Sequence, residues 1–187
     1  LAVEIVVFGL LAPNFLTTTN IFNVLRQVSM LGIASCGLTF VILSGGMDLS
    51  IGAQIALVGL LGGLLMTKLH VPVAVAVVLM ILMGTAIGAI NGYLSVKFKI
   101  MPMIVTLAMM TSLTGVAKII TNGYPVYGFD ASFALIGQGY FFGLVPFPVI
   151  IFFIVIFAAW FILQKTYFGR HVYALGSNAE AARLAGV

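Results

Sequence analysis

Charged side chains are scarce in this sequence: Lys, Arg, Asp and Glu make up 6% of its 187 residues, whereas hydrophobic residues make up 63%. The mean hydropathy of +1.27 lies far above that of an ordinary soluble domain. The composition therefore indicates a membrane protein, with lipid as the solvent for most of the chain. The net charge of +4 then reflects orientation in the membrane and not nucleic-acid binding.

Residues for catalysis and metal binding are equally scarce. Cys36 is the single cysteine, which excludes an intrachain disulfide. His70 and His171 stand far apart without a nearby set of ligands, which argues against a metal site. The sequence lacks a glycine-rich loop ending in Gly-Lys-Ser/Thr, so we expect this chain to bind no ATP itself. No nucleophile stands beside a base, and we therefore expect a component that is not an enzyme.

Five or six long apolar runs divide the chain. A span needs about 20 helical residues, because every backbone group in hydrocarbon must be hydrogen-bonded internally. We therefore expect an all-α fold: a polytopic transmembrane helix bundle with a short cytoplasmic helix, forming one domain over 1–187. Asn20 is expected to cap the second run, and Pro102 to open the fifth. The runs are 1–11, 21–43, 51–66, 71–96, 101–121 and 144–163, of which the first resembles the tail of a span and the third is short.

The ends of the chain and its basic residues give two further expectations. The chain begins at Leu1 without an initiator Met and ends directly after an expected helix, so we expect a portion of a longer membrane protein. Alternating crossings place five basic residues on one side and three on the other. Because Lys and Arg are enriched in cytoplasmic loops, the first group is expected inside and the aromatic segment 122–143 outside. The first group is Lys97, Lys99, Lys165, Arg170 and Arg183, and the second is Arg26, Lys68 and Lys118.

One polar constellation, "SGGMDLSIG" at 44–52, separates two apolar runs. Either it is a tight turn in which Asp48 or Ser50 caps the next helix, or it is a ligand-facing break within the membrane. Glycines recurring every fourth residue at 84, 88 and 92 would form a flat helix face, either for helix packing or along a substrate path. The candidate residues for a substrate path or helix break are Ser44, Gly45, Gly46, Asp48, Ser50 and Asn91.

The terminal segment "GSNAEAARLAGV", 176–187, reads as a short water-exposed helix. Ser177 and Glu180 have the spacing of a capping box, and Gly186 is placed to end the helix. So short a helix is marginal alone and must dock on something. Its partner is either a groove on another protein or, for an interfacial helix, the neighbouring spans.

The order of these motifs resembles the permease subunits of bacterial ABC importers for ribose and related sugars. The resemblance rests on "SGGMDLSIG", "NGYLSVKFKIMPMIVTLAMMTSLTGV", "TNGYPVYG" and "TYFGRHVYALGSNAEAARLAGV", and covers nearly the whole chain. It implies a multi-pass protein of the plasma membrane, of which this chain is the N-terminal portion without the C-terminal part, and it implies that ATP is bound by a separate cytoplasmic subunit. The further partners implied are an extracytoplasmic sugar-binding protein, which segment 122–143 would face, and a second permease copy or paralogue.

The same resemblance identifies residues 177–186 as a cytoplasmic coupling helix that docks on the ATP-binding subunit. Glu180-Ala181-Ala182, followed four residues later by Gly186, matches the family's loop motif. Alternatives are an ion-coupled secondary carrier, a permease for autoinducer-2 or another small polar solute, and a structural membrane subunit. The residues that the resemblance assigns to coupling are Gly169, Arg170, Ser177, Asn178, Glu180, Ala181, Ala182, Arg183 and Gly186, with Gly169 and Arg170 as the hinge.

Overall fold

The structure is a computed structural model that describes residues 2–186. Over that range it contains nine α-helices and one hairpin of two short strands, which confirms the expected all-α class. The helices are α1 Ala2–Leu11, α2 Thr18–Leu43, α3 Ile51–Thr67, α4 Val73–Phe98, α5 Pro102–Thr121, α6 Ala131–Gln138, α7 Phe147–Lys165, α8 Tyr167–Ser177 and α9 Ala179–Leu184; the strands are β1 Tyr140–Phe141 and β2 Val145–Pro146.

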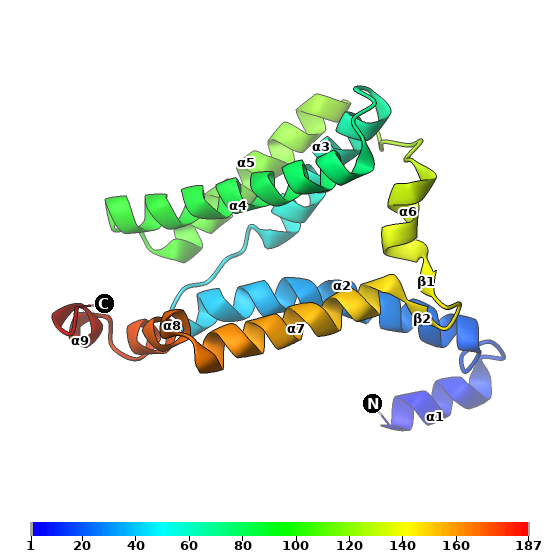
Figure 1. Cartoon of the computed structure of the whole chain (residues 1–187), viewed down its shortest axis with the longest axis horizontal. Helices are drawn as coiled ribbons and strands as arrows, with labels where there is room; N and C mark the ends of the chain where they lie inside the picture. The colour runs from blue at the N-terminus through cyan, green and yellow to red at the C-terminus, as the bar shows by residue number, and fades with distance from the viewer. Residues whose placement is uncertain (1, 187) are drawn as a thin grey trace.

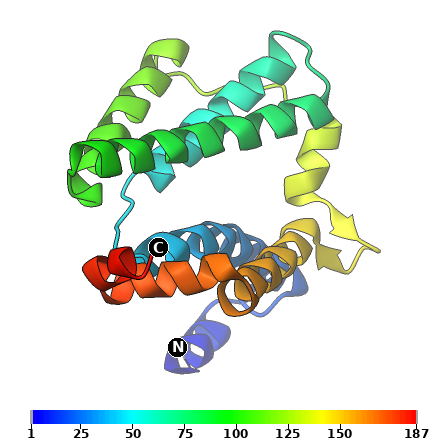
Figure 2. The same cartoon turned by 60° about the vertical axis from the view of Figure 1, so that its left-hand side comes forward.

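The helices form two packed groups, which lie one above the other in Figures 1 and 2. In one group α2 packs along α7 and α8, and in the other α3, α4 and α5 pack together. Among the described residues, α2, α4, α5 and α7 are long and apolar enough to cross a membrane, and α1 and α3 are shorter apolar helices. The apolar faces that these helices leave exposed are therefore suited to lipid or to further helices.

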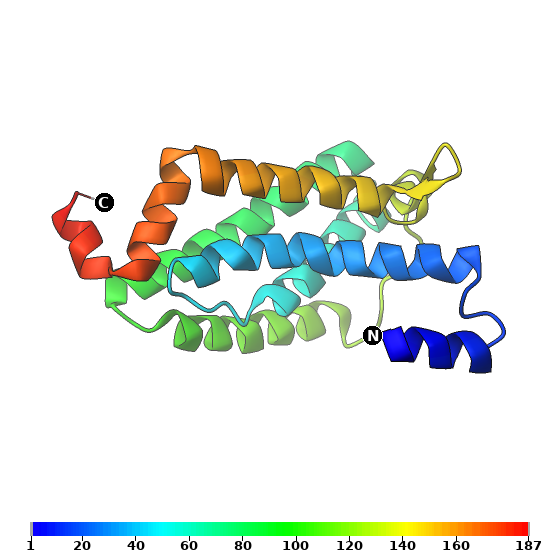
Figure 3. The same ribbon diagram turned by 90° about the horizontal axis from the view of Figure 1, so that it is seen from below.

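The direction of each helix determines at which end of the molecule its basic residues lie. In Figures 1 and 3 the turn between α4 and α5 lies at the same end of the molecule as α8 and α9, and α6 lies at the opposite end. We call these the α8 end and the α6 end. The ends of α4 and α7 carry Lys97, Lys99 and Lys165 to the α8 end. This matches the grouping expected from sequence, and the positive-inside rule predicts that the α8 end is cytoplasmic.

The first long helix begins earlier than expected. The prediction that Asn20 caps it is wrong: α2 starts at Thr18, and Thr17 is its N-cap. The Thr17 hydroxyl oxygen accepts a hydrogen bond from the Asn20 backbone N–H at 3.4 Å, while the Asn20 side chain donates to the Phe15 carbonyl at 2.7 Å. By contrast, Pro102 opens α5 as predicted, since its missing N–H has no partner to lose in a first turn.

The aromatic segment 122–143 contains α6 and the start of the hairpin, neither of which the sequence indicated. Asp130 is the N-cap of α6, and its carboxylate accepts from the Ser132 backbone N–H at 2.7 Å. Hydrogen bonds from the Ser132 hydroxyl and backbone N–H lower the pKa of Asp130, with a small opposing effect of burial. Because the ionised form is the one that caps, this contribution to stability is present at neutral pH and is lost as the pH falls through the lowered pKa.

Candidate functional site

The segment 44–50 leaves α2 and enters the α3–α5 group as extended chain. After the turn at Ser44 and Gly45, residues 46–50 adopt no helix. The Leu49 backbone N–H donates to the Thr106 hydroxyl oxygen at 3.1 Å, and that hydroxyl lies 3.2 Å from the Met47 carbonyl oxygen, to which it can donate. A side chain of α5 thus holds the segment in place without a regular backbone ladder.

Ser50 is the centre of a buried polar network. It is fully buried, and its hydroxyl donates to Asp48 Oδ1 at 2.6 Å while its backbone N–H donates to the same oxygen at 2.7 Å. The Ser50 oxygen accepts from Gln54 Nε2 at 2.7 Å and from Asn91 Nδ2 at 3.0 Å. Ser50 is the N-cap residue of α3 by position, but its side chain caps no backbone N–H, since its oxygen already accepts from Gln54 and Asn91. The network joins the extended segment to both α3 and α4.

This polar network lies inside the helix group and not at its edge. Asn91 stands seven residues before Phe98, the end of α4, and Thr106 stands four residues after Pro102, the start of α5. At a rise of about 1.5 Å per residue, these positions lie roughly 10 Å and 6 Å from the α8 end of their helices. Asn91 and Thr106 are only 5% and 3% exposed. The arrangement suits a break that places polar groups at membrane depth.

A cavity of about 330 Å³ adjoins the network. The Oδ1 oxygen of Asn91, one of the residues that line it, is buried and has no hydrogen-bond partner among the described residues. Leu175 of α8 also contributes to its wall. Its polar and glycine lining residues are Ser44, Gly45, Gly46, Asp48, Gly88, Asn91, Gly92, Ser95 and Thr106.

The chain bends between α7 and α8 at Thr166. This residue is the N-cap of α8, and its hydroxyl oxygen accepts from the Gly169 backbone N–H at 3.2 Å. Gly169 and Arg170, the expected hinge, lie inside α8, three and four residues after this bend, and their role as a hinge stays a prediction. A Cβ at Gly169 would overlap the backbone of Leu163, so glycine permits α8 to fold back closely on α7. Arg170 lies over the Tyr167 ring, 4.1 Å from its centroid.

The cap of the last helix, α9, is Asn178 and not Ser177. Asn178 has an extended backbone and its Oδ1 accepts from the Ala181 backbone N–H at 2.9 Å. Ser177 remains the last residue of α8, so its helical backbone cannot serve as an N-cap, and the predicted capping box is wrong. Glu180 instead forms an exposed ion pair with Arg183 at 3.0 Å.

The remaining predicted features of this segment have clear positions. Gly186 follows α9 with φ +85°, a left-handed conformation that favours glycine, and its N–H donates to the Arg183 carbonyl at 3.1 Å. This confirms the prediction that Gly186 ends the helix. Ala182 is buried and Ala181 is exposed, and α9 packs on α8. Residues 177–186 therefore contain a short capped helix over Ala179–Leu184.

Gly176 connects the terminal segment to the polar network. A Cβ at Gly176 would overlap the carbonyl oxygen of Leu43, the last residue of α2, and would stand 3.5 Å from the Gly45 nitrogen. Its neighbour Leu175 lines the cavity together with Asp48 and Asn91. The two polar constellations of the sequence, more than 100 residues apart in the chain, thus meet at one place. The C-terminal end of α8 therefore rests directly on the end of α2, where segment 44–50 begins.

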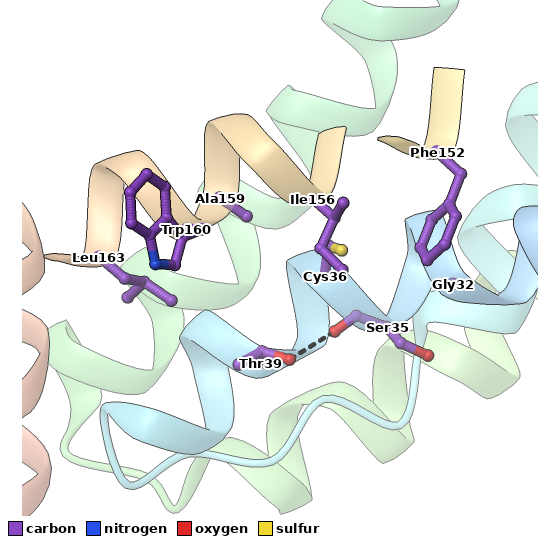
Figure 4. A pocket seen from close by; sticks show the side chains of 9 residues that line it. All are labelled: Gly32, Ser35, Cys36, Thr39, Phe152, Ile156, Ala159, Trp160 and Leu163. Carbon is purple, nitrogen blue, oxygen red and sulfur yellow. Dashed lines mark hydrogen bonds between the residues drawn. The ribbon is translucent and has the colours of Figure 1, made fainter. Parts of the chain in front are cut away.

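A second cavity, of about 400 Å³, lies between α2 and α7 and has a different character. Figure 4 shows Ser35 and Thr39 beside Cys36, Phe152 and Trp160. Both hydroxyls donate to carbonyls of their own helix, at 2.8 Å each. With these groups satisfied, the cavity presents mainly apolar surface and little that would orient a polar solute.

At the α6 end, Arg26 ties α2 to the segment 122–143. Its guanidinium donates to the Gln138 carbonyl at 3.2 Å and to the Tyr140 hydroxyl at 3.0 Å, and it lies over the Tyr140 ring. Tyr124 and Tyr127 of the same segment are largely exposed. The segment is therefore anchored through Arg26 while presenting aromatic side chains at the surface.

Several residues of the site were missed from sequence. Gln54 carried a usable signal, because it is a lone amide one helical turn after Ser50 in an apolar run. Thr106, Leu175 and Gly176 carried none, since their roles depend on contacts between distant segments. A Cβ added at any glycine of the stripe at 84, 88 and 92 would meet nothing within 4 Å in the described chain, and two of these glycines border the polar cavity.

Comparison with known proteins agrees with these features. Residues 20–187 match the family described as "Branched-chain amino acid transport system / permease component". The whole chain aligns with the ribose import permease protein RbsC of Escherichia coli (strain K12) at 42% identity, covering 59% of that protein. It also aligns over its full length with RbsC of Bacillus subtilis (strain 168) at 40% identity and of Haemophilus influenzae at 39%, covering 58% of each. No solved structure matches the chain.

The chain thus spans less than two thirds of the length of these relatives. The four apolar helices of membrane-spanning length and the permease relatives together indicate a multi-pass protein of the bacterial inner membrane. The family match covers all but the first 19 residues. The chain therefore belongs to this family of transport-system permease components.

Proposed function

We propose that the full-length protein is the permease subunit of an ABC importer that carries ribose or a related monosaccharide across the inner membrane. The similarity to three ribose import permeases supports the substrate class. The observation that carries the proposal is the contact of Gly176 in α8 with the end of α2 at Leu43. Through it, a force applied to the terminal segment outside the spans would reach the polar network within them.

In this proposal the chain does not hydrolyse ATP but transmits a conformational change that ATP hydrolysis drives in another subunit. ATP is bound and hydrolysed by a separate cytoplasmic subunit on which α9 docks, and a sugar-binding protein delivers the solute at the α6 end. A second copy of the permease, or a paralogue, completes the pathway. Closure of the ATP-binding subunits would move α8 and α9 as a rigid unit, and that movement would favour one of two permease states.

Isolation of the full-length protein from its native membrane tests the partnership. We expect a stable ATP-binding protein to accompany it in mild detergent, and we expect that association to weaken when α9 is disrupted. A permease that is isolated alone but transports ribose at the normal rate would contradict the proposal, because no ATP-binding subunit would be present to drive transport.

Replacement of the α9 cap gives a graded test. Asn178→Ala removes the oxygen that accepts from Ala181 N–H, and the loss of such a cap costs about 1 kcal/mol. Because α9 has six residues and is marginal alone, we expect ATP-driven ribose uptake to fall about fivefold, as a loss of about 1 kcal/mol implies. Asn178→Asp keeps the acceptor and should retain most of the uptake. Initial rates normalised to the amount of protein in the membrane provide the measurement, and equal rates in the two variants would refute the role of the cap.

A further inference from the structure

The cavity beside the polar network has the size and lining of a small-molecule site. Its volume of about 330 Å³ falls within the range of roughly 300–1,000 Å³ that is typical of ligand pockets. Gly88 and Gly92 border it, and a Cβ at either position would meet nothing within 4 Å, so the α4 backbone leaves open space there. Side chains from segment 44–48, α4 and α5 surround this space.

The lining has hydrogen-bond acceptors in excess of donors. Asn91 is 5% exposed, and its Oδ1 has no hydrogen-bond partner in the part of the chain that the structure describes, although its Nδ2 donates to Ser50. Asp48 Oδ1 accepts twice from Ser50, but from the described residues Asp48 Oδ2 receives only a long contact of 3.5 Å from Gln54. Within residues 2–186 no basic side chain forms an ion pair with Asp48. A buried acceptor without a donor is unfavourable by about 1–3 kcal/mol, so a ligand that supplies hydroxyl donors would be stabilised here.

The chemistry of this lining selects among possible ligands. A lipid chain would gain nothing from Asp48 and Asn91, and a divalent cation such as Ca²⁺ needs six or more oxygen ligands, which these two side chains do not supply. A neutral polyol can donate to both acceptors and can accept from the Ser95 hydroxyl, which also lines the cavity. Polyhydroxylated solutes therefore match the lining best.

We infer that this cavity is a monosaccharide subsite at the α8 end of the pathway, in which Asp48 and Asn91 accept hydrogen bonds from sugar hydroxyls. The identity of the sugar rests on the proposed function. Leu175 of α8 forms part of the wall, so a movement of the terminal segment would open or narrow the subsite. Sugar release would in this way depend on the position of α8.

Protection of an introduced cysteine tests the subsite in the full-length protein. In a transport-competent background without native cysteines, Ser95→Cys places a thiol on the cavity wall. We expect D-ribose to slow its alkylation by N-ethylmaleimide several-fold, relative to sucrose at equal osmolarity. Lys97→Cys, two residues further along α4 and exposed, is the matched control, and D-ribose should not change its rate.

Two variants of Asn91 separate sugar contact from packing. Asn91→Leu keeps the number and branching of the side-chain heavy atoms but removes the acceptor, and we expect it to abolish protection and to raise the KM for ATP-driven ribose uptake about three- to tenfold, as the loss of one hydrogen bond implies. Asn91→Asp keeps an acceptor oxygen and should retain protection. A purely structural role would change thermal stability in Asn91→Leu and leave KM and protection as in the parent.

The outcomes also separate this inference from the proposed function. If the parent protein imports ribose with ATP but ribose fails to protect Ser95→Cys, the subsite is wrong and the permease assignment stands. An unchanged KM in Asn91→Leu likewise overturns the subsite. If the parent complex imports no ribose at all, the proposed function itself fails.

Discussion

Replacing Gly176 with valine is expected to lower ATP-driven ribose uptake strongly while the protein still inserts into the membrane. Even a Cβ at this position would overlap the Leu43 carbonyl oxygen, and backbone atoms cannot move aside as a flexible side chain can. Overpacking of this kind typically costs about 1–3 kcal/mol, and here it would separate α8 from α2. We expect a loss of about tenfold or more in the initial uptake rate, with Gly176→Ala intermediate.

Gly37→Val in α2 is the matched control. It makes the same substitution at a helical glycine, but a Cβ at Gly37 meets nothing within 4 Å. Both variants should be present in the membrane at similar amounts, as judged by immunoblot of isolated membranes. Normal uptake by Gly176→Val, or an equal loss in the two variants, would show that the contact between α8 and α2 does not carry coupling.

Replacing Ser50 with alanine is expected to give the largest loss of stability. Within residues 2–186, its hydroxyl is the only partner of Asn91 Nδ2 and the nearest partner of Gln54 Nε2, and it donates to Asp48. Without it, the Asn91 amide would have no hydrogen bond at all, because its Oδ1 already has no partner in the described chain. Leaving buried polar groups unsatisfied costs about 1–3 kcal/mol each, so we expect a loss of about 2–4 kcal/mol.

Thermal unfolding of the purified full-length protein in detergent measures this loss. Ser35→Ala in α2 is the control, since Ser35 is exposed and its hydroxyl donates only to the Leu31 carbonyl of its own helix. We expect Ser35→Ala to unfold within about 0.5 kcal/mol of the parent, as most surface substitutions do. Equal destabilisation in the two variants would mean that the polar network contributes no more to stability than a serine whose hydroxyl bonds only to its own helix.

Local patterns predicted the helices because lipid forces apolar runs to satisfy their own backbone. The start of α5 at Pro102 and the end of α9 at Gly186 followed from the backbone preferences of proline and glycine. Both features are decided within a few residues of sequence. Apolar runs are likewise local features of the sequence, so the membrane-spanning helices could be predicted without knowledge of tertiary contacts.

Predictions from sequence were wrong or incomplete in two situations. In one, neighbouring residues can each cap a helix; in the other, a contact with a distant segment determines the structure. Ser177 and Asn178 are adjacent cap residues, and the choice between them depends on where α8 stops, which its packing on α2 and α7 helps to set. The residues Thr106 and Gly176 act on segment 44–50 across long stretches of chain, which no pattern within either segment encodes. The hairpin of β1 and β2 was missed because strands of two residues have no periodicity.

We propose a coupling of sugar movement to ATP through the terminal segment of the protein. Its most direct test reconstitutes the full-length permease with its ATP-binding subunit and sugar-binding protein in proteoliposomes and follows radiolabelled ribose. We predict accumulation that requires ATP on the side of α9 and that persists when proton and sodium gradients are collapsed. Accumulation that proceeds without nucleotide and stops when those gradients are collapsed would contradict the account and identify a secondary carrier.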